Sequence, residues 1–129
     1  MTINNAMNVS SSGLSAERFR MDVIAANIAN ANSTQVGNQE PYRRKDVVLS
    51  SGPDGVQVSG VEDDQTPFVQ KYDPGNPNAD INGYVKGSNV QPINEMVDMM
   101  SASRAYEANV AAFNTEKGMV KAALSIGKV

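Results

Sequence analysis

The chain contains no cysteine, no histidine and no tryptophan among its 129 residues. Without cysteine it cannot form a disulfide framework or a thiolate metal cluster. Without histidine it lacks the commonest general base and the commonest metal ligand. Enzymatic chemistry would have to rest on carboxylate, lysine, tyrosine or serine side chains, so we expect no cofactor and no enzyme.

The sequence also lacks a surplus of positive charge and a long apolar run. Eleven basic and 14 acidic side chains give a net charge of −3, and a weakly acidic chain has little attraction for nucleic acid or an anionic membrane. A membrane-spanning helix needs about 20 apolar residues, and none is present. Residues 3–9 are too polar for a signal-peptide core. We expect no nucleic-acid partner, no direct membrane insertion and no cleaved signal.

Helix breakers and helix formers occupy different parts of the chain. All six prolines lie between Pro41 and Pro92, whereas every methionine, and every alanine except Ala79, lies outside that stretch. This distribution predicts one helix over residues 3–31, capped by Thr2, and a second over residues 92–126 that starts at Pro92. The length itself fits a single structural unit.

Both terminal segments carry apolar residues at alternating spacings of three and four, with two polar breaks in each. This spacing is typical of a coiled-coil seam, although an ordinary core stripe has the same spacing. If the helices pair within the chain, alignment of their midpoints places Leu14 near Phe113 and Met21 near Tyr106. The pattern therefore predicts two long helices that pair as an antiparallel coiled coil.

The middle of the chain contains short strand candidates at residues 45–50, 55–62, 67–72 and 84–86. Residues 51–55 (Ser-Gly-Pro-Asp-Gly) suit a hairpin turn, and Val56 and Val58 indicate one buried face. We therefore predict an α+β fold in which a small β-rich module lies between the two helices. The expected division is residues 1–35, 36–90 and 91–129.

Three local patterns suggest binding or catalytic sites, and each has a simpler interpretation. Residues 78–83 resemble the start of a calcium loop, but Asn89 stands where such loops place a glutamate, so a hydrogen-bonded turn is favoured. The acidic run 62–64 is typical of solvated carboxylates. Arg43, Arg44 and Lys45 are better explained by a solvated edge or by salt bridges between subunits than by nucleic acid.

Several motifs together resemble the flagellar axial proteins, which form the rod and hook of the bacterial flagellum. Residues 26–32 (Ala-Asn-Ile-Ala-Asn-Ala-Asn) resemble the N-terminal signature of that family. The resemblance continues in order through segments 42–45, 72–74, 82–85, 89–90, 95–99 and 103–109, and it is greatest for the proximal-rod members. Ser88 and Gln91 depart from the usual family residues before the second helix, and the loop between residues 33 and 60 is short.

This resemblance implies a structural subunit of the proximal rod, exported unfolded by the flagellar type III apparatus into the extracytoplasmic basal body, where it transmits motor torque. Its partners would be itself, other rod proteins and the export apparatus. Its terminal helices would be disordered in the monomer and ordered on assembly. Alternatives are another rod or hook subunit, a secreted adhesin and a carboxylate hydrolase. The residues expected to pack helices or subunits together are Leu14, Met21, Ile24, Asn27, Ile28, Asn30, Met96, Met99, Tyr106, Asn109, Val110, Phe113, Val120 and Leu124.

Overall fold

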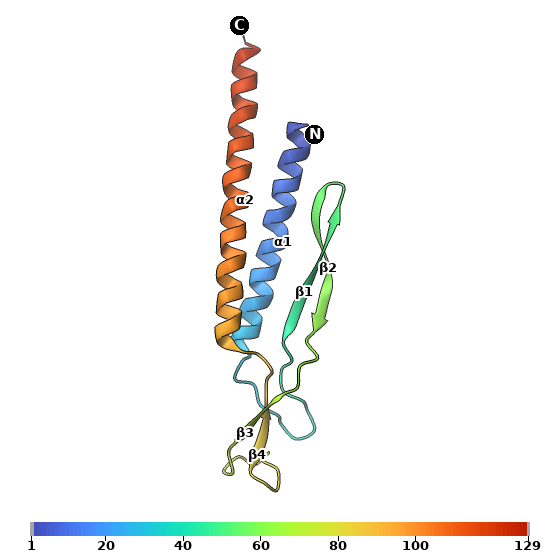
Figure 1. The fold of residues 1–129 in the computed structure, drawn as a ribbon, viewed down its shortest axis with the longest axis vertical. Coiled ribbons are helices and arrows are strands. Elements are labelled where there is room, and N and C mark those ends of the chain that lie inside the picture. The colour runs from blue at the N-terminus through green and yellow to red at the C-terminus, as the bar shows by residue number, and fades with distance from the viewer. Residues whose placement is uncertain (1, 129) are drawn as a thin grey trace. The chain divides into compact units, whose positions relative to one another are not determined.

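Along the chain, four strands lie between two long helices. A computed structural model describes residues 2–128. The elements are α1 (Ile3–Ala29), β1 (Lys45–Gly52), β2 (Gly55–Asp63), β3 (Val69–Tyr72), β4 (Tyr84–Gly87) and α2 (Pro92–Ile126) (Figure 1). The predicted α+β class, both helices and all four strands are confirmed.

The helix ends follow from local side-chain chemistry. Asn5 N donates to Thr2 Oγ1 across 3.3 Å, which caps α1 as predicted. The Asn30 side chain donates to the carbonyl oxygen of Ala26 across 2.8 Å, so the helix ends at Ala29, two residues earlier than expected. Pro92 is the first residue of α2, where its missing N–H leaves no unpaired donor.

The described residues divide into two compact units, whereas the length had suggested one. Unit 1 comprises residues 2–22, 47–60 and 100–128, and unit 2 comprises residues 23–46 and 61–99. Each unit draws on both helices and on the segment between them. Helices of 27 and 35 residues extend farther than one compact core can surround.

In unit 1 the two helices approach closely and run antiparallel. Ser10 Oγ donates to Glu116 Oε1 across 3.0 Å. A Cβ on Gly13 would lie 2.8 Å from Asn109 Nδ2, so the missing side chain allows the close approach. The predicted alignment agrees within one residue at Ser10. At Gly13 the prediction brings residue 114 into contact, whereas the neighbour of Gly13 is Asn109, five positions earlier, so the predicted alignment is only approximate.

The β1–β2 hairpin turns where predicted, and its tip is attached to α1 within unit 1. Val56 N donates to Ser12 Oγ across 3.0 Å, and Ser12 Oγ donates in turn to the carbonyl oxygen of Val9. Gly55 has a φ of +120°, and a Cβ there would lie 2.1 Å from Ser12 Oγ. Glycine is therefore required at this position. Val58 is half-buried but Val56 is exposed, so the expected buried face is only partly formed.

Unit 2 contains the antiparallel β3–β4 pair, which runs from Val69 opposite Gly87 to Tyr72 opposite Tyr84. The Tyr72 and Tyr84 rings pack edge to face with centroids 5.3 Å apart. Val85 is almost fully buried, as are Ile24 and Val90. Two polar side chains of this unit, Asn27 and Glu95, are completely buried, and they define the site described next.

Candidate functional site

Asn27, in the last turns of α1, lies at the centre of a buried polar network in unit 2. Its Nδ2 donates to the carbonyl oxygen of Lys45 across 2.8 Å and to Glu95 Oε2 across 3.0 Å. Its Oδ1 accepts from Lys45 N and from the Tyr42 hydroxyl. These four bonds use the full capacity of the amide, so Asn27 has none left for a neighbouring subunit.

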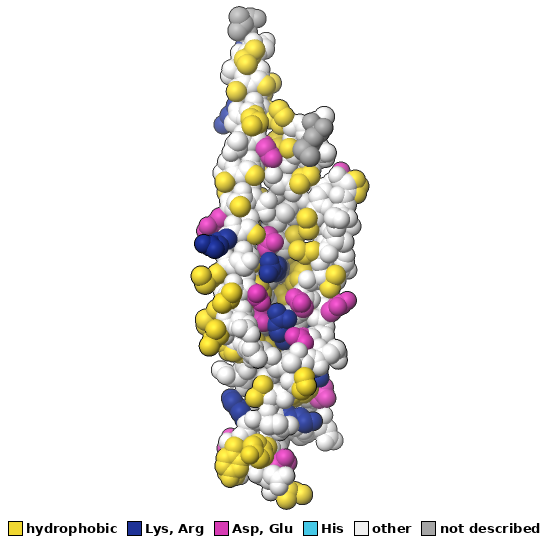
Figure 2. Space-filling view, viewed as in Figure 1, with side chains coloured by type: hydrophobic (Ala, Val, Ile, Leu, Met, Phe, Trp, Pro, Cys, Tyr) yellow, Lys and Arg dark blue, Asp and Glu magenta, His cyan; other side chains and the backbone are white. Residues whose placement is uncertain are grey.

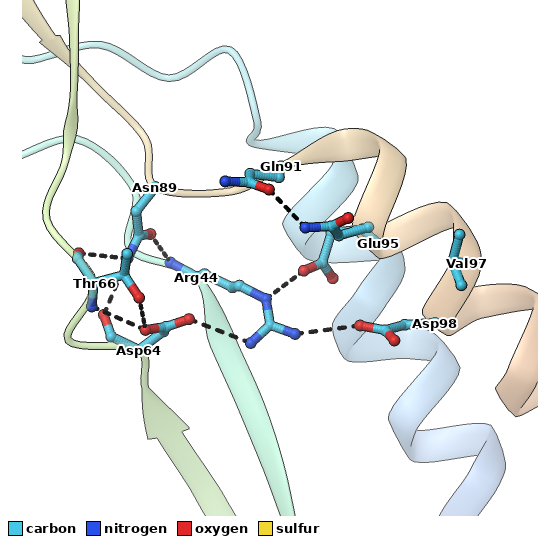
Figure 3. Close-up of a pocket in the computed structure, with 9 residues that line it drawn as sticks. Arg44, Asp64, Thr66, Asn89, Gln91, Glu95, Val97 and Asp98 are labelled. Atoms are coloured by element: carbon cyan, nitrogen blue, oxygen red, sulfur yellow. Dashed lines mark hydrogen bonds and ion pairs between the residues drawn. The ribbon is translucent and has the colours of Figure 1, made fainter.

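Arg44 connects the segment that leads into β1 to the start of α2. Its guanidinium donates to Glu95 Oε1 through Nε and to Asp98 Oδ2 through a terminal nitrogen at 3.4 Å. On the other side it pairs with Asp64 at 3.5 Å (Figure 3). Glu95 is completely buried. A buried carboxylate is tolerated only when it is paired and hydrogen-bonded, and Arg44 and Asn27 meet both conditions.

Asn89 joins the segment before α2 to the same network. Its Oδ1 accepts from Arg44 N across 2.6 Å, and its Nδ2 donates to the carbonyl oxygens of Asp64 and Thr66, both at 3.0 Å. Its neighbour Ser88 donates to the carbonyl oxygen of Tyr42 across 2.6 Å. We refer to Asn27, Arg44, Asp64, Asn89 and Glu95 together as the polar junction.

The ionisation of the groups around the junction favours its ion pairs. Hydrogen bonds from the Thr66 side chain and backbone, together with the charge of Arg44, hold the pKa of Asp64 below its ordinary value. Burial lowers the pKa of Arg44, but the Glu95 hydrogen bond and the surrounding carboxylates raise that pKa overall. Asp64 and Arg44 are therefore fully charged at neutral pH.

A cavity of about 460 Å³ opens beside the junction within unit 2. Its charged lining residues are Arg44, Asp64, Glu95 and Asp98. The carboxylates there are engaged by Arg44 or Thr66, and the lowered pKa of Asp64 suits an ion pair rather than a proton donor. Among residues 2–128 no group of three or more carboxylates is arranged to hold a metal ion. The geometry is that of a structural crosslink.

Comparisons with known proteins agree with a structural role. Residues 7–35 match the family model described as "Flagella basal body rod protein", and residues 81–126 match "Flagellar basal body rod FlgEFG protein C-terminal". The chain is 43% identical to the flagellar basal-body rod protein FlgC of Bacillus subtilis, with 99% of this chain and 100% of the relative covered. The same protein of Salmonella typhimurium is 42% identical with the same coverage, and that of Borreliella burgdorferi is 40% identical with 98% of each chain covered.

The chain belongs to the FlgC family of flagellar basal-body rod proteins. Membership in this family makes it a structural component of the rod in the bacterial flagellar basal body, which confirms the resemblance noted in the sequence. A rod component is built into an assembly with other rod components. In the described part of the chain, neither helix has the length and hydropathy that crossing a bilayer requires.

The FlgC-like motifs converge on the polar junction. Asn27 comes from the N-terminal signature, Arg44 from the motif at 42–45, Asn89 from that at 89–90, and Glu95 from that at 95–99. Sequence reasoning placed Arg43 and Arg44 at a solvated edge or in bridges between subunits. For Arg44 this was wrong, because its ion pairs lie within the chain. Arg43 instead lies 4.2 Å above the Phe68 ring and donates to the carbonyl oxygens of Asp64 and Thr66.

The calcium-like segment forms hydrogen-bonded turns, as favoured. Asp80 Oδ1 accepts from the backbone of Asn82 and Tyr84 and so holds the turn of the calcium-like loop, whereas Asn78 Oδ1 accepts from Gly37 N and joins that loop to another segment. The acidic run is solvated at Glu62 and Asp63 only, because Asp64 pairs with Arg44 in the polar junction. Asp63 pairs with Lys45 at 2.7 Å on the surface, and Glu62 is exposed.

The residues predicted to pack helices or subunits differ in how far this chain covers them. Ile24 and Asn27 are buried, whereas Asn30, Met96 and Leu124 are exposed. The remaining nine are partly covered, namely Leu14, Met21, Ile28, Met99, Tyr106, Asn109, Val110, Phe113 and Val120. Asn30 caps the end of α1 through its bond to Ala26, whereas Asn27 connects α1 to α2. Their part in subunit assembly remains a prediction.

Proposed function

We propose that this chain is a proximal-rod subunit that assembles through the apolar faces of α1 and α2 and transmits motor torque as part of the axial drive shaft. The observation that carries the proposal is the set of large apolar side chains that α2 leaves exposed near its two ends. They are Ile93, Met96, Val97, Met100, Met119, Leu124 and Ile126, each more than half exposed. Exposed apolar side chains grouped in this way mark interaction sites.

The proposed partners are other copies of the chain, other rod proteins and, before assembly, the flagellar type III export apparatus. The polar junction supports a role in transmitting force, because ion pairs and hydrogen bonds join α1, the approach to β1 and α2 there. We further propose that the chain is not an enzyme and binds neither nucleic acid nor a cofactor. The net charge of −3 supports the absence of a nucleic-acid partner.

Deletion of the gene, followed by complementation, tests the proposal. We expect the deletion to abolish filament assembly and swimming, and the wild-type gene to restore both. Ile28→Asp and Phe113→Asp put a carboxylate into the proposed helix interfaces, so both variants should be excluded from purified basal bodies. Lys86→Asp also introduces a carboxylate, but at an exposed position in β4, and should be incorporated normally. Unchanged incorporation of both Ile28→Asp and Phe113→Asp would refute the interface assignment.

A position elsewhere in the axial structure is the second candidate, because residues 81–126 match the C-terminal model shared by the FlgEFG proteins. Immunogold labelling of purified basal bodies separates the two. Label confined to the proximal rod supports our proposal, and label on the distal rod or hook establishes the alternative.

A further inference from the structure

The first two turns of α2 combine exposed apolar side chains with an acidic cavity. Ile93 is 77% exposed and Val97 is 60% exposed, and Val97 also lines the cavity beside the polar junction. Asp64, Glu95 and Asp98 carry three negative charges there against one positive charge on Arg44, which leaves a net charge of −2. Figure 2 shows hydrophobic side chains gathered over this part of α2. We call Ile93, Val97, Asp64 and Asp98 the acidic face.

The last turns of α2 carry the complementary chemistry. Residues 117–128 contain Lys117, Lys121 and Lys128 and no aspartate or glutamate. From Lys121 to Lys128 every residue is exposed, so no other part of the described chain covers any side of these turns. Lys117, Lys121 and Leu124 follow a spacing of four and three, which puts them in one row along the helix. We call residues 117–128 the basic helix end.

We infer that the basic helix end of one copy docks on the acidic face of a second copy. Leu124 packs against Ile93 and Val97, and Lys121 approaches Asp98 and Asp64. The partner is a second copy because every chain carries both complementary surfaces, one basic and apolar and the other acidic and apolar. Such a contact joins two different surfaces, so repetition of it builds a ring or an open helical assembly, and the helical one suits a rod. This inference rests on the proposed function and names a contact that holds the rod together.

A helix end without packing partners supports the same conclusion. Exposed terminal turns are marginally stable in water, because most helical stability in proteins comes from packing of an apolar face. Leu124 is 64% exposed and Ile126 is 76% exposed, so these turns gain little from packing within their own chain. A partner surface of opposite charge stabilises them and selects the orientation of docking.

Cysteine crosslinking tests the contact directly, since the chain has no cysteine of its own. A deletion strain is complemented with a Val97→Cys and Leu124→Cys double variant, and its isolated basal bodies are oxidised. We expect disulfide-linked dimers and longer products of this chain, with mass spectrometry identifying the 97–124 bond. Each single-cysteine variant should give no dimer, because the contact joins unlike surfaces. Ser51→Cys with Leu124→Cys is the matched control and should give none either.

Charge reversal in the same double-cysteine background tests the electrostatic part. Lys121→Glu or Asp98→Lys alone should lower the yield of the 97–124 bond by at least about tenfold, because each places like charges together. The two reversals combined restore an opposite pair between positions 121 and 98 and should raise the yield well above that of either single reversal. Lys86→Glu makes the same charge change on β4 and should leave the yield unchanged.

The same strains separate this inference from the proposed function. If the deletion strain swims normally, the proposed function fails. If the double-cysteine strain swims and builds rods but position 97 or 124 crosslinks to a different rod protein, or to nothing, the docking inference is overturned and the rod function stands. Swimming cells with 97–124 bonds between copies of this chain support both.

Discussion

The side-chain amide of Asn27 donates a hydrogen bond to Glu95 Oε2 across 3.0 Å, and neither side chain is exposed to solvent. This bond joins the end of α1 to the start of α2. The other oxygen of Glu95 accepts from Arg44 Nε. Removing any one of these three groups leaves a buried polar or charged partner without compensation.

Glu95→Ala should therefore destabilise unit 2 strongly. Loss of the carboxylate removes the buried partner of the Arg44 guanidinium and leaves the Asn27 amide without one of its acceptors, and breaking a buried pair costs about 3–5 kcal/mol. Asp98→Ala removes a more exposed partner of the same guanidinium and should cost less than about 1 kcal/mol. Urea denaturation followed by circular dichroism measures both. Similar losses from the two substitutions would contradict the central place given to Glu95.

Asn27→Asp tests the amide without changing its size. The new carboxylate cannot donate to the Lys45 carbonyl oxygen, and it lies beside the carboxylate of Glu95. We expect a loss of roughly 2–4 kcal/mol in the free energy of unfolding, from two lost donors and from like-charge repulsion. Asn30→Asp makes the same chemical change at an exposed position, and there the loss should stay near 0.5 kcal/mol. Equal effects at the two positions would argue against a buried network.

Gly55→Ala should weaken the attachment of the hairpin tip to α1. A methyl group there would lie 2.1 Å from Ser12 Oγ and 3.1 Å from the Cα atom of Val9, at a φ of +120°. We expect about 1–3 kcal/mol of destabilisation and faster amide exchange at Val56. Gly60→Ala, where nothing lies within 4 Å of the added carbon, is the control. Unchanged exchange at Val56 in Gly55→Ala would show that the attachment does not depend on this glycine.

Acid should destabilise unit 2 through Asp64. The pKa of Asp64 is lower in the folded chain than its ordinary value of 3.8, chiefly because Thr66 donates to it. The folded state therefore binds the proton less readily than the unfolded state, and this contribution is complete above pH 3.8 and is lost as the pH falls through the lower folded value. Denaturation midpoints recorded between about pH 2 and pH 7 should decline less steeply at the acid end in Asp64→Asn. If the midpoint falls equally steeply with pH in both proteins, Asp64 does not contribute to the loss of stability in acid.

The helices and strands could be predicted because their signals are local. Pro92 is a residue whose chemistry suits a helix start, and Thr2 caps α1 through a backbone group only three residues away. The hairpin turn likewise follows from Pro53 and Gly55. The alignment of α1 against α2 was less accurate, because it depends on Gly13 approaching Asn109, and the seam spacing alone does not reveal such a close approach.

The polar junction could not be predicted from one sequence. Arg44 and Glu95 are 51 positions apart, and nothing near either residue shows that they meet. Exposed arginines are far more common than buried ones, so a solvated patch was the natural interpretation. One signal was nevertheless available, since four junction residues lie in motifs shared with rod proteins. Each of these four polar residues comes from a different motif, and polar residues spread over several family motifs suggest side chains that meet in the fold.

The sequence separations within the junction constrain the order in which the chain can fold. The bond between Asn27 and Glu95 spans 68 positions, so its formation waits until the start of α2 is available. Contacts between such distant residues form late because closure of a long loop costs entropy before any bond repays it. A chain that lacks α2 has no acceptor for Arg44 on that side and cannot bury Asn27. The junction can therefore form only in a chain that includes both α1 and α2.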